Sequence, residues 1–135
     1  MDRKKIIQLV LYTFSPLFLG VLIYVASRSN SIYFLSLFSL NNEKIHLPDL
    51  IKFNVVDGLW AFSASTLLQI IWDWELKKSL VFWFFILVFT SIYFEVNYGT
   101  YDSKDVVLIT IGLFTPLTFT MLNNLKTIKY EQKNY

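Results

Sequence analysis

VVDGLWAFSASTLLQIIW, residues 55–72, is the stretch that decides how this chain folds. Eighteen apolar-rich residues form a helix of about 27 Å, nearly the roughly 30 Å of a bilayer's hydrocarbon core. Asp57 is the third residue of this run. A carboxylate inside a membrane span is costly and usually faces the interior of a helix bundle or a water-filled cavity. We therefore expect Asp57 to face another helix rather than lipid.

Three further stretches have the same apolar character. The chain is 55% hydrophobic and only 16% charged, below the roughly 25% charged residues of an average soluble domain. No repeat or domain boundary is visible, so we expect residues 1–135 to form a single integral membrane domain. The predicted fold class is all-α, a bundle of four transmembrane helices. The predicted spans are Ile6–Ala26, Asn54–Trp72, Ser79–Val96 and Val106–Leu122.

The longest connection lies between the first and second predicted spans. Its central segment, IYFLSLFSL at residues 32–40, is too short to cross a bilayer and too apolar for a free loop. A short interfacial or re-entrant helix is therefore predicted there. The first span exceeds the usual apolar region of a signal peptide, about 7–15 residues, and no A-x-A cleavage site follows it. We expect a retained signal anchor.

The distribution of basic residues predicts the orientation. Four spans place both termini on one side, where eight lysine and arginine residues fall, against four on the opposite side. The positive-inside rule then predicts cytoplasmic termini in a bacterial-type inner (plasma) membrane. The net charge of +2 gives no reason to expect nucleic acid as a partner. Six of the ten acids fall on the outer side: Glu43, Asp49, Asp57, Glu95, Asp102 and Asp105.

Four of these acids form a candidate polar cluster at the outer membrane face: Asp57, Glu95, Asp102 and Asp105. Alternating helix directions bring the ends that carry them to one level, with His46 and Asp49 nearby in sequence. Gathered carboxylates can bind a divalent cation through oxygen, or one can stay protonated and act as acid or base. Their spacing matches no known metal loop, so no cofactor is assigned. Helix capping is the alternative role for Asp102 and Asp105.

A second feature of the 55–72 run is a face of small residues. Ala61, Ala64 and Ser65 lie four, seven and eight positions after Asp57, so all four share one side of a helix. Small residues allow helices to approach closely in a bilayer. This packing face suggests an alternative function, a non-catalytic membrane subunit or scaffold that docks a larger membrane partner through the second span.

Four short motifs lie between Leu47 and Leu113: Leu47-Pro48-Asp49, Asp57-Gly58-Leu59-Trp60-Ala61, Glu95 and Gly99-Thr100-Tyr101-Asp102-x-x-Asp105. With these motifs the stretch resembles the VanZ-like family of small polytopic membrane proteins. The resemblance implies association with cell-envelope lipids or glycopeptide tolerance, and it places the same acids in the family's polar cluster. The leading hypothesis is a VanZ-like envelope protein whose outer acids engage a lipid head group or cation, with catalysis on a lipid-linked substrate left open.

Overall fold

The computed structural model describes residues 2–28, 47–98 and 102–133, and it confirms an all-α fold for these parts of the chain. The described residues do not include the predicted interfacial helix at 32–40, His46 or residues 99–101. Two short π-helical segments, η1 (Leu9–Phe14) and η3 (Leu50–Val55), run directly into the α-helices that follow them. The elements are α1 (Arg3–Gln8), η1 (Leu9–Phe14), α2 (Ser15–Arg28), η3 (Leu50–Val55), α4 (Val56–Ile71), α5 (Lys78–Tyr98) and α6 (Ser103–Lys133).

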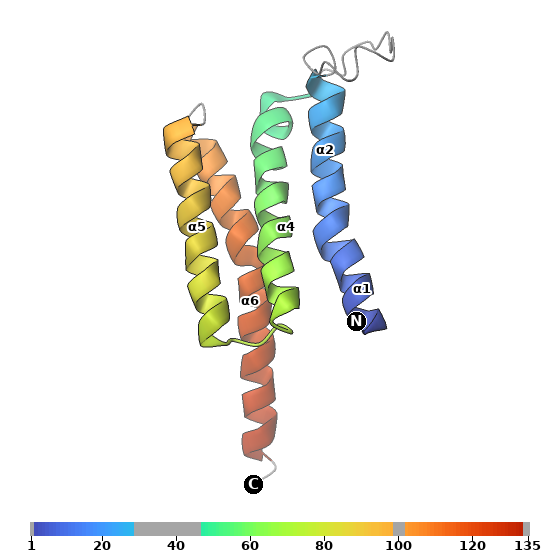
Figure 1. Ribbon diagram of the computed structural model, residues 1–135, viewed down its shortest axis with the longest axis vertical. Coiled ribbons are helices and arrows are strands. Elements are labelled where there is room, and N and C mark those ends of the chain that lie inside the picture. Colours follow the sequence, from blue (N-terminus) through green and yellow to red (C-terminus); the bar gives the residue numbers. More distant parts are fainter. Residues whose placement is uncertain (1, 29–46, 99–101, 134–135) are drawn as a thin grey trace.

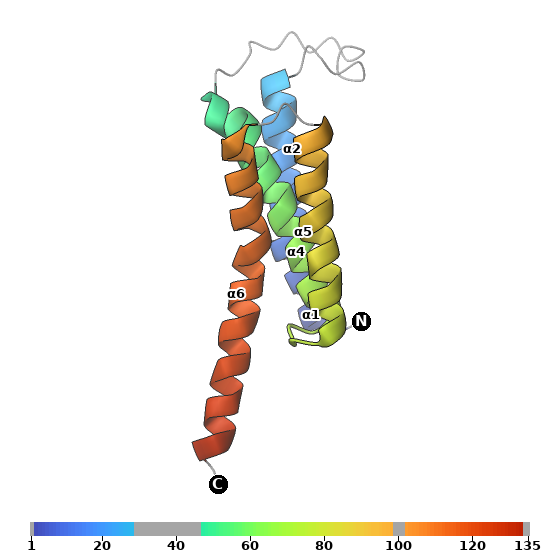
Figure 2. The same ribbon diagram turned by 90° about the vertical axis from the view of Figure 1, so that its left-hand side faces the viewer.

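These elements form four rods that run side by side with alternating direction (Figure 1). The first rod is α1–η1–α2, the second is η3–α4, and α5 and α6 are the third and fourth. The start of α1 and the end of α6 therefore lie at one end of the molecule, which we call the terminal end. The other end, where α2 and α5 finish and η3 and α6 begin, is the distal end. Figure 2 shows α6 extending beyond the other rods at the terminal end.

Three helices of the described residues are long and apolar enough to cross a membrane: Arg3–Ser27, Lys78–Asn97 and Ser103–Asn124. They contain the predicted first, third and fourth spans and are consistent with a membrane protein. The predicted second span, Asn54–Trp72, is not among them. Its rod carries several polar side chains that are buried in the bundle, and these lower its apolarity. They are Asn54, Ser63, Ser65, Thr66 and Gln69.

The second rod lies at the centre of the packing. Helix α4 packs chiefly on α6 and also contacts α2, η1 and α5. The other rods expose large apolar side chains, and Phe89 of α5 reaches 71% exposure. Contiguous apolar surface of this extent marks contact with lipid or another protein. The bundle is therefore more polar at its centre than on much of its outer surface, which suits an apolar solvent.

The widened turn η1 precedes a proline. Pro16 has no backbone N–H, and its ring clashes with the carbonyl four residues earlier. The chain adopts π-helical turns over Leu9–Phe14, where the N–H of Ser15 bonds to the carbonyl of Val10 instead. The first rod therefore continues through the proline as one helix.

The turn after α4 is tied to the first and last rods at the terminal end. Asp73 and Trp74 have φ angles of 57° and 58°, which end the helix. Asp73 forms an ion pair with Lys5, and Trp74 Nε1 donates a hydrogen bond to Gln8 Oε1 at 3.3 Å. Asn124 Nδ2 donates to the carbonyl of Trp74 at 3.0 Å. In the same turn Lys77 forms an ion pair with Glu75. The hydrogen bond to the Glu75 carboxylate raises the pKa of Lys77 above its ordinary value.

Candidate functional site

Helices α4 and α6 approach so closely that their backbones touch, and this contact positions the acids. A Cβ added at Gly112 would lie 2.3 Å from the carbonyl oxygen of Gly58 and 3.0 Å from the backbone nitrogen of Phe62. Ser65 is fully buried and donates a hydrogen bond to the carbonyl of Leu113 at 2.6 Å. Ala61 is also buried, next to Gly112. Ala61 and Ser65 of the predicted packing face are thus covered by α6 of the same chain.

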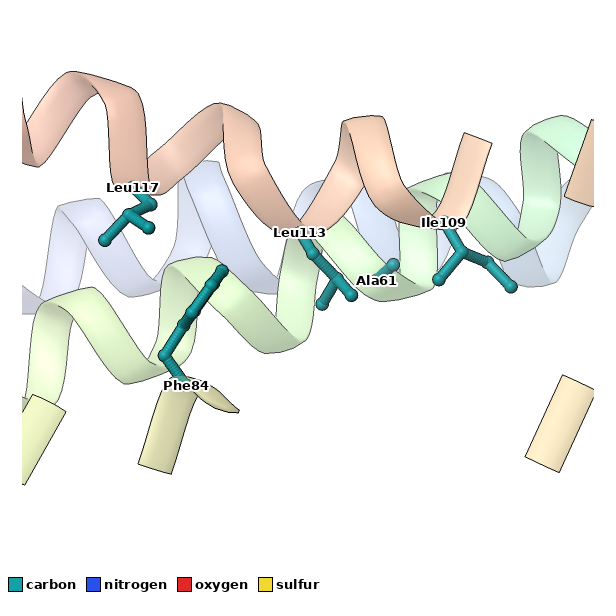
Figure 3. Close-up of a cluster of buried hydrophobic side chains, with 5 residues drawn as sticks. All are labelled: Ala61, Phe84, Ile109, Leu113 and Leu117. Atoms are coloured by element: carbon teal, nitrogen blue, oxygen red, sulfur yellow. The ribbon is translucent and has the colours of Figure 1, made fainter. Parts of the chain in front are cut away.

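The hydrophobic core continues this contact toward α5. Figure 3 shows Ala61, Phe84, Ile109, Leu113 and Leu117 gathered between the three helices. The Phe84 ring also meets Phe114 edge to face, with centroids 5.2 Å apart. This core holds α5 against α4 and α6, and so sets the position of Glu95 relative to Asp57.

A groove of about 400 Å³ lies toward the distal end, between α4, α5 and α6. Asp57 lines it from the first turn of α4, and Glu95 lines it from near the end of α5. We call this the distal groove. Because α4 and α5 run in opposite directions, the first turn of one reaches the level of the last turns of the other. The complete lining is Asp57, Trp60, Ala61, Ala64, Ser91, Phe94, Glu95 and Ile109.

Two acids of the predicted cluster, Asp102 and Asp105, have structural partners and do not line this groove. Asp102 Oδ1 accepts a hydrogen bond from the backbone N–H of Lys104 at 3.0 Å, and its carbonyl accepts one from the N–H of Asp105. Asp102 therefore caps α6. Asp105 is buried and accepts a hydrogen bond from Asn54 Nδ2. Both carboxylates still lie within Coulombic range of Glu95.

Asn54 belongs to the site region but was not among the candidate residues from the sequence. It lies in η3 with 4% of its surface exposed and joins the second rod to the start of α6 through Asp105. The sequence did indicate that Asn54 is buried in the bundle, because Asn54 precedes Ala61 by seven residues and so falls on the small-residue face. An amide on a buried helix face needs a hydrogen-bonding partner.

The distal groove combines two carboxylates with apolar and aromatic walls. Trp60 and Phe94 are about half exposed, at 48% and 56%. Within residues 2–28, 47–98 and 102–133, no three acidic or histidine side chains are grouped to hold a metal ion. Carboxylates accept charge-assisted hydrogen bonds from an ammonium group, and aromatic faces attract cations. The groove is therefore suited to an organic amine or a hydroxyl-rich group attached to an apolar chain.

Comparison with known proteins gives no match to a family model, a curated protein or a solved structure. The VanZ-like resemblance of residues 47–113 remains a prediction, carried by the motifs quoted above.

Proposed function

We propose that this chain is a four-span protein of a bacterial-type inner membrane, with both termini in the cytoplasm. The second rod joins six residues of η3 to sixteen of α4, a length of about 33 Å at 1.5 Å per residue. Its central position supports a fourth span, because a helix enclosed by others need not be apolar on every side. Lys5, Lys77 and Lys78 at the terminal end support a cytoplasmic location of that end.

In this proposal the distal groove binds the head group of an envelope lipid at the outer face. The observation that carries it is that Asp57 and Glu95, from two different helices, line one groove with Trp60 and Phe94. The carboxylates accept hydrogen bonds from an amine or hydroxyl head group, while the aromatic side chains contact the adjoining apolar chain. Membership of the VanZ-like family is part of the proposal, since its motifs include the same two acids. No reaction is assigned.

The alternative, a subunit that docks a membrane partner through the second span, relied on the small-residue face. Most of that face is covered within the chain, because Ala61 and Ser65 are buried and Ser65 donates a hydrogen bond to the carbonyl of Leu113 in α6, whereas Ala64 lines the distal groove. A partner would have to use the exposed side of α4 instead, where Trp60, Leu67 and Ile71 lie. We therefore prefer the lipid-binding function.

Neutralising either groove carboxylate is expected to weaken binding of an amine-bearing lipid. Asp57→Asn and Glu95→Gln keep the side-chain size and remove the charge. A hydrogen bond to a charged group contributes about 1.5–3 kcal/mol, so each change is expected to raise the Kd by about tenfold or more. The measurement is a titration of the delipidated protein in detergent with phosphatidylethanolamine that carries a fluorophore on its acyl chain.

Asp49→Asn is the matched control. Asp49 is an exposed acid at the same end, directly before η3, and it does not line the groove. Its replacement removes the same charge from the distal end and is expected to leave the Kd unchanged. Equal loss of binding in all three variants would mean a general charge effect. Wild-type affinity in both Asp57→Asn and Glu95→Gln, with normal folding by circular dichroism, would contradict the proposal.

A further inference from the structure

A second cavity, of about 410 Å³, lies toward the terminal end between the first rod, α4 and α6. We call it the terminal cavity. It shares no lining residue with the distal groove. Its volume falls within the roughly 300–1,000 Å³ of typical ligand sites. It is lined by Gln8, Tyr12, Phe62, Thr66, Trp74, Pro116, Phe119 and Asn123.

The lining of the terminal cavity is uncharged and mixed in polarity. Phe62, Pro116 and Phe119 provide apolar walls, whereas Gln8 and Asn123 provide amides. The Trp74 indole donates to Gln8 Oε1 at 3.3 Å, a long hydrogen bond for this pair of atoms. Lys5 and Asp73, which are close in sequence to the lining residues Gln8 and Trp74, form an ion pair. Their two charges therefore cancel. Such a lining favours a neutral ligand with a few hydroxyl groups over a charged one.

A buried amide next to this lining has unused hydrogen-bonding capacity. Gln69 follows Phe62 by seven residues and Thr66 by three, so the three share one face of α4. Gln69 is fully buried, and its Oε1 accepts a hydrogen bond from Thr120 at 2.8 Å. Its Nε2 has no acceptor among the described residues. Buried polar atoms of this kind usually have a partner. Gln69 does not line the cavity and solvent does not reach this atom, so the donor becomes available to a ligand only if the side chains around it move.

We propose that the terminal cavity binds an uncharged, hydroxyl-bearing lipid of the monoacylglycerol or diacylglycerol type. The glycerol hydroxyl groups bond to the amides of Gln8 and Asn123, and the acyl chain lies along Phe62 and Phe119. Tyr12 and Phe119 are 48% and 56% exposed, so the cavity borders the surface that faces the bilayer. This inference rests on the membrane placement proposed above and is independent of lipid binding in the distal groove.

The test uses two photoactivatable probes that differ only in charge. One is a monoacylglycerol with a diazirine in its acyl chain, and the other is its phosphate ester. The full-length protein is reconstituted in phosphatidylcholine nanodiscs, irradiated with each probe and mapped by mass spectrometry. The neutral probe is expected to label residues 62–66 and 116–123, and excess unlabelled monoacylglycerol is expected to suppress the labelling. The phosphate probe is expected to label these segments about tenfold less.

Two substitutions of the same type locate the site. Asn123→Phe places a large side chain in the cavity lining and is expected to reduce labelling about tenfold. Asn97→Phe makes the same change at an exposed asparagine of α5 at the distal end and is expected to have no effect. The groove variants Asp57→Asn and Glu95→Gln are expected to label like the wild type, which separates this inference from the proposed function.

Two results would overturn the proposal. One is labelling of residues 62–66 and 116–123 no stronger than that of the exposed face of α5, where Phe82, Phe85 and Phe89 lie. The other is equal labelling of the cavity segments by the neutral and phosphate probes. Both are read from the wild-type protein, so the test decides even where Asn123→Phe fails to fold.

Discussion

Replacing Gly112 with alanine is expected to lower the free energy of unfolding by about 3 kcal/mol, the upper part of the range for overpacking a tight interior. The new methyl group would lie 2.3 Å from the carbonyl oxygen of Gly58 and 3.2 Å from the Ala61 methyl group. The nearest obstacle is backbone, so α4 and α6 must move apart. Thermal and denaturant unfolding in detergent, followed by circular dichroism, measures the loss. Phosphatidylethanolamine binding should weaken as well, because the distal groove is built on the same two helices.

Gly20→Ala is the matched control for this prediction. Its added Cβ would also be close to a neighbour, at 2.7 Å and 2.9 Å from Trp60 Nε1 and Cδ1. That neighbour is a half-exposed side chain that can turn away, whereas a helix backbone cannot. Alanine is also favoured over glycine in a helix by about 1 kcal/mol, so the net change at Gly20 is expected to be small. Equal destabilisation by the two substitutions would contradict the backbone contact between α4 and α6.

That three helices are long and apolar enough to cross a membrane was predictable, because this property depends on composition and length alone. The predicted spans Ser79–Val96 and Val106–Leu122 lie within α5 and α6. Helix α6 nevertheless continues to Lys133, since a helix does not have to end where the sequence becomes polar. The second rod was harder to assign. The sequence shows Ser65, Thr66 and Gln69 as polar interruptions of an apolar run, but only the packing on α6 shows that they are buried.

The candidate site was predictable in part for a similar reason. The short connection at residues 72–77 makes α4 and α5 antiparallel, and this brings Asp57 and Glu95 to one groove. The separation of Asp105 from that groove depends on its bond to Asn54, a contact across 51 positions of the chain. Local periodicity places each of these residues on a helix face, but it does not show which residue of another helix lies opposite. The terminal cavity also depends on how whole rods pack.

Replacing Asn54 with leucine is the second change for which we expect a large effect. Leucine is similar in size but cannot donate the hydrogen bond that the Asp105 carboxylate accepts. Asp105 is only 6% exposed, so its charge would stay buried without this partner. Leaving a buried charged group without its hydrogen bond costs more than the roughly 1–3 kcal/mol of a neutral group. The unfolding free energy of Asn54→Leu in detergent should fall by about 3 kcal/mol or more, a large fraction of the roughly 5–15 kcal/mol of a typical domain.

The double substitution Asn54→Leu with Asp105→Leu tests the cause. Two apolar side chains of similar volume can replace a buried polar pair at little cost, because neither charge nor donor is left unpaired. We therefore expect the double variant to be more stable than Asn54→Leu alone. Asp102→Asn provides the comparison, since changing the half-buried cap of α6 should cost at most about 1 kcal/mol. If Asn54→Leu lowered the unfolding free energy no more than Asp102→Asn does, the buried Asp105 carboxylate would not depend on Asn54. The assignment of Asp105 to a structural pair, rather than to lipid binding, would then be wrong.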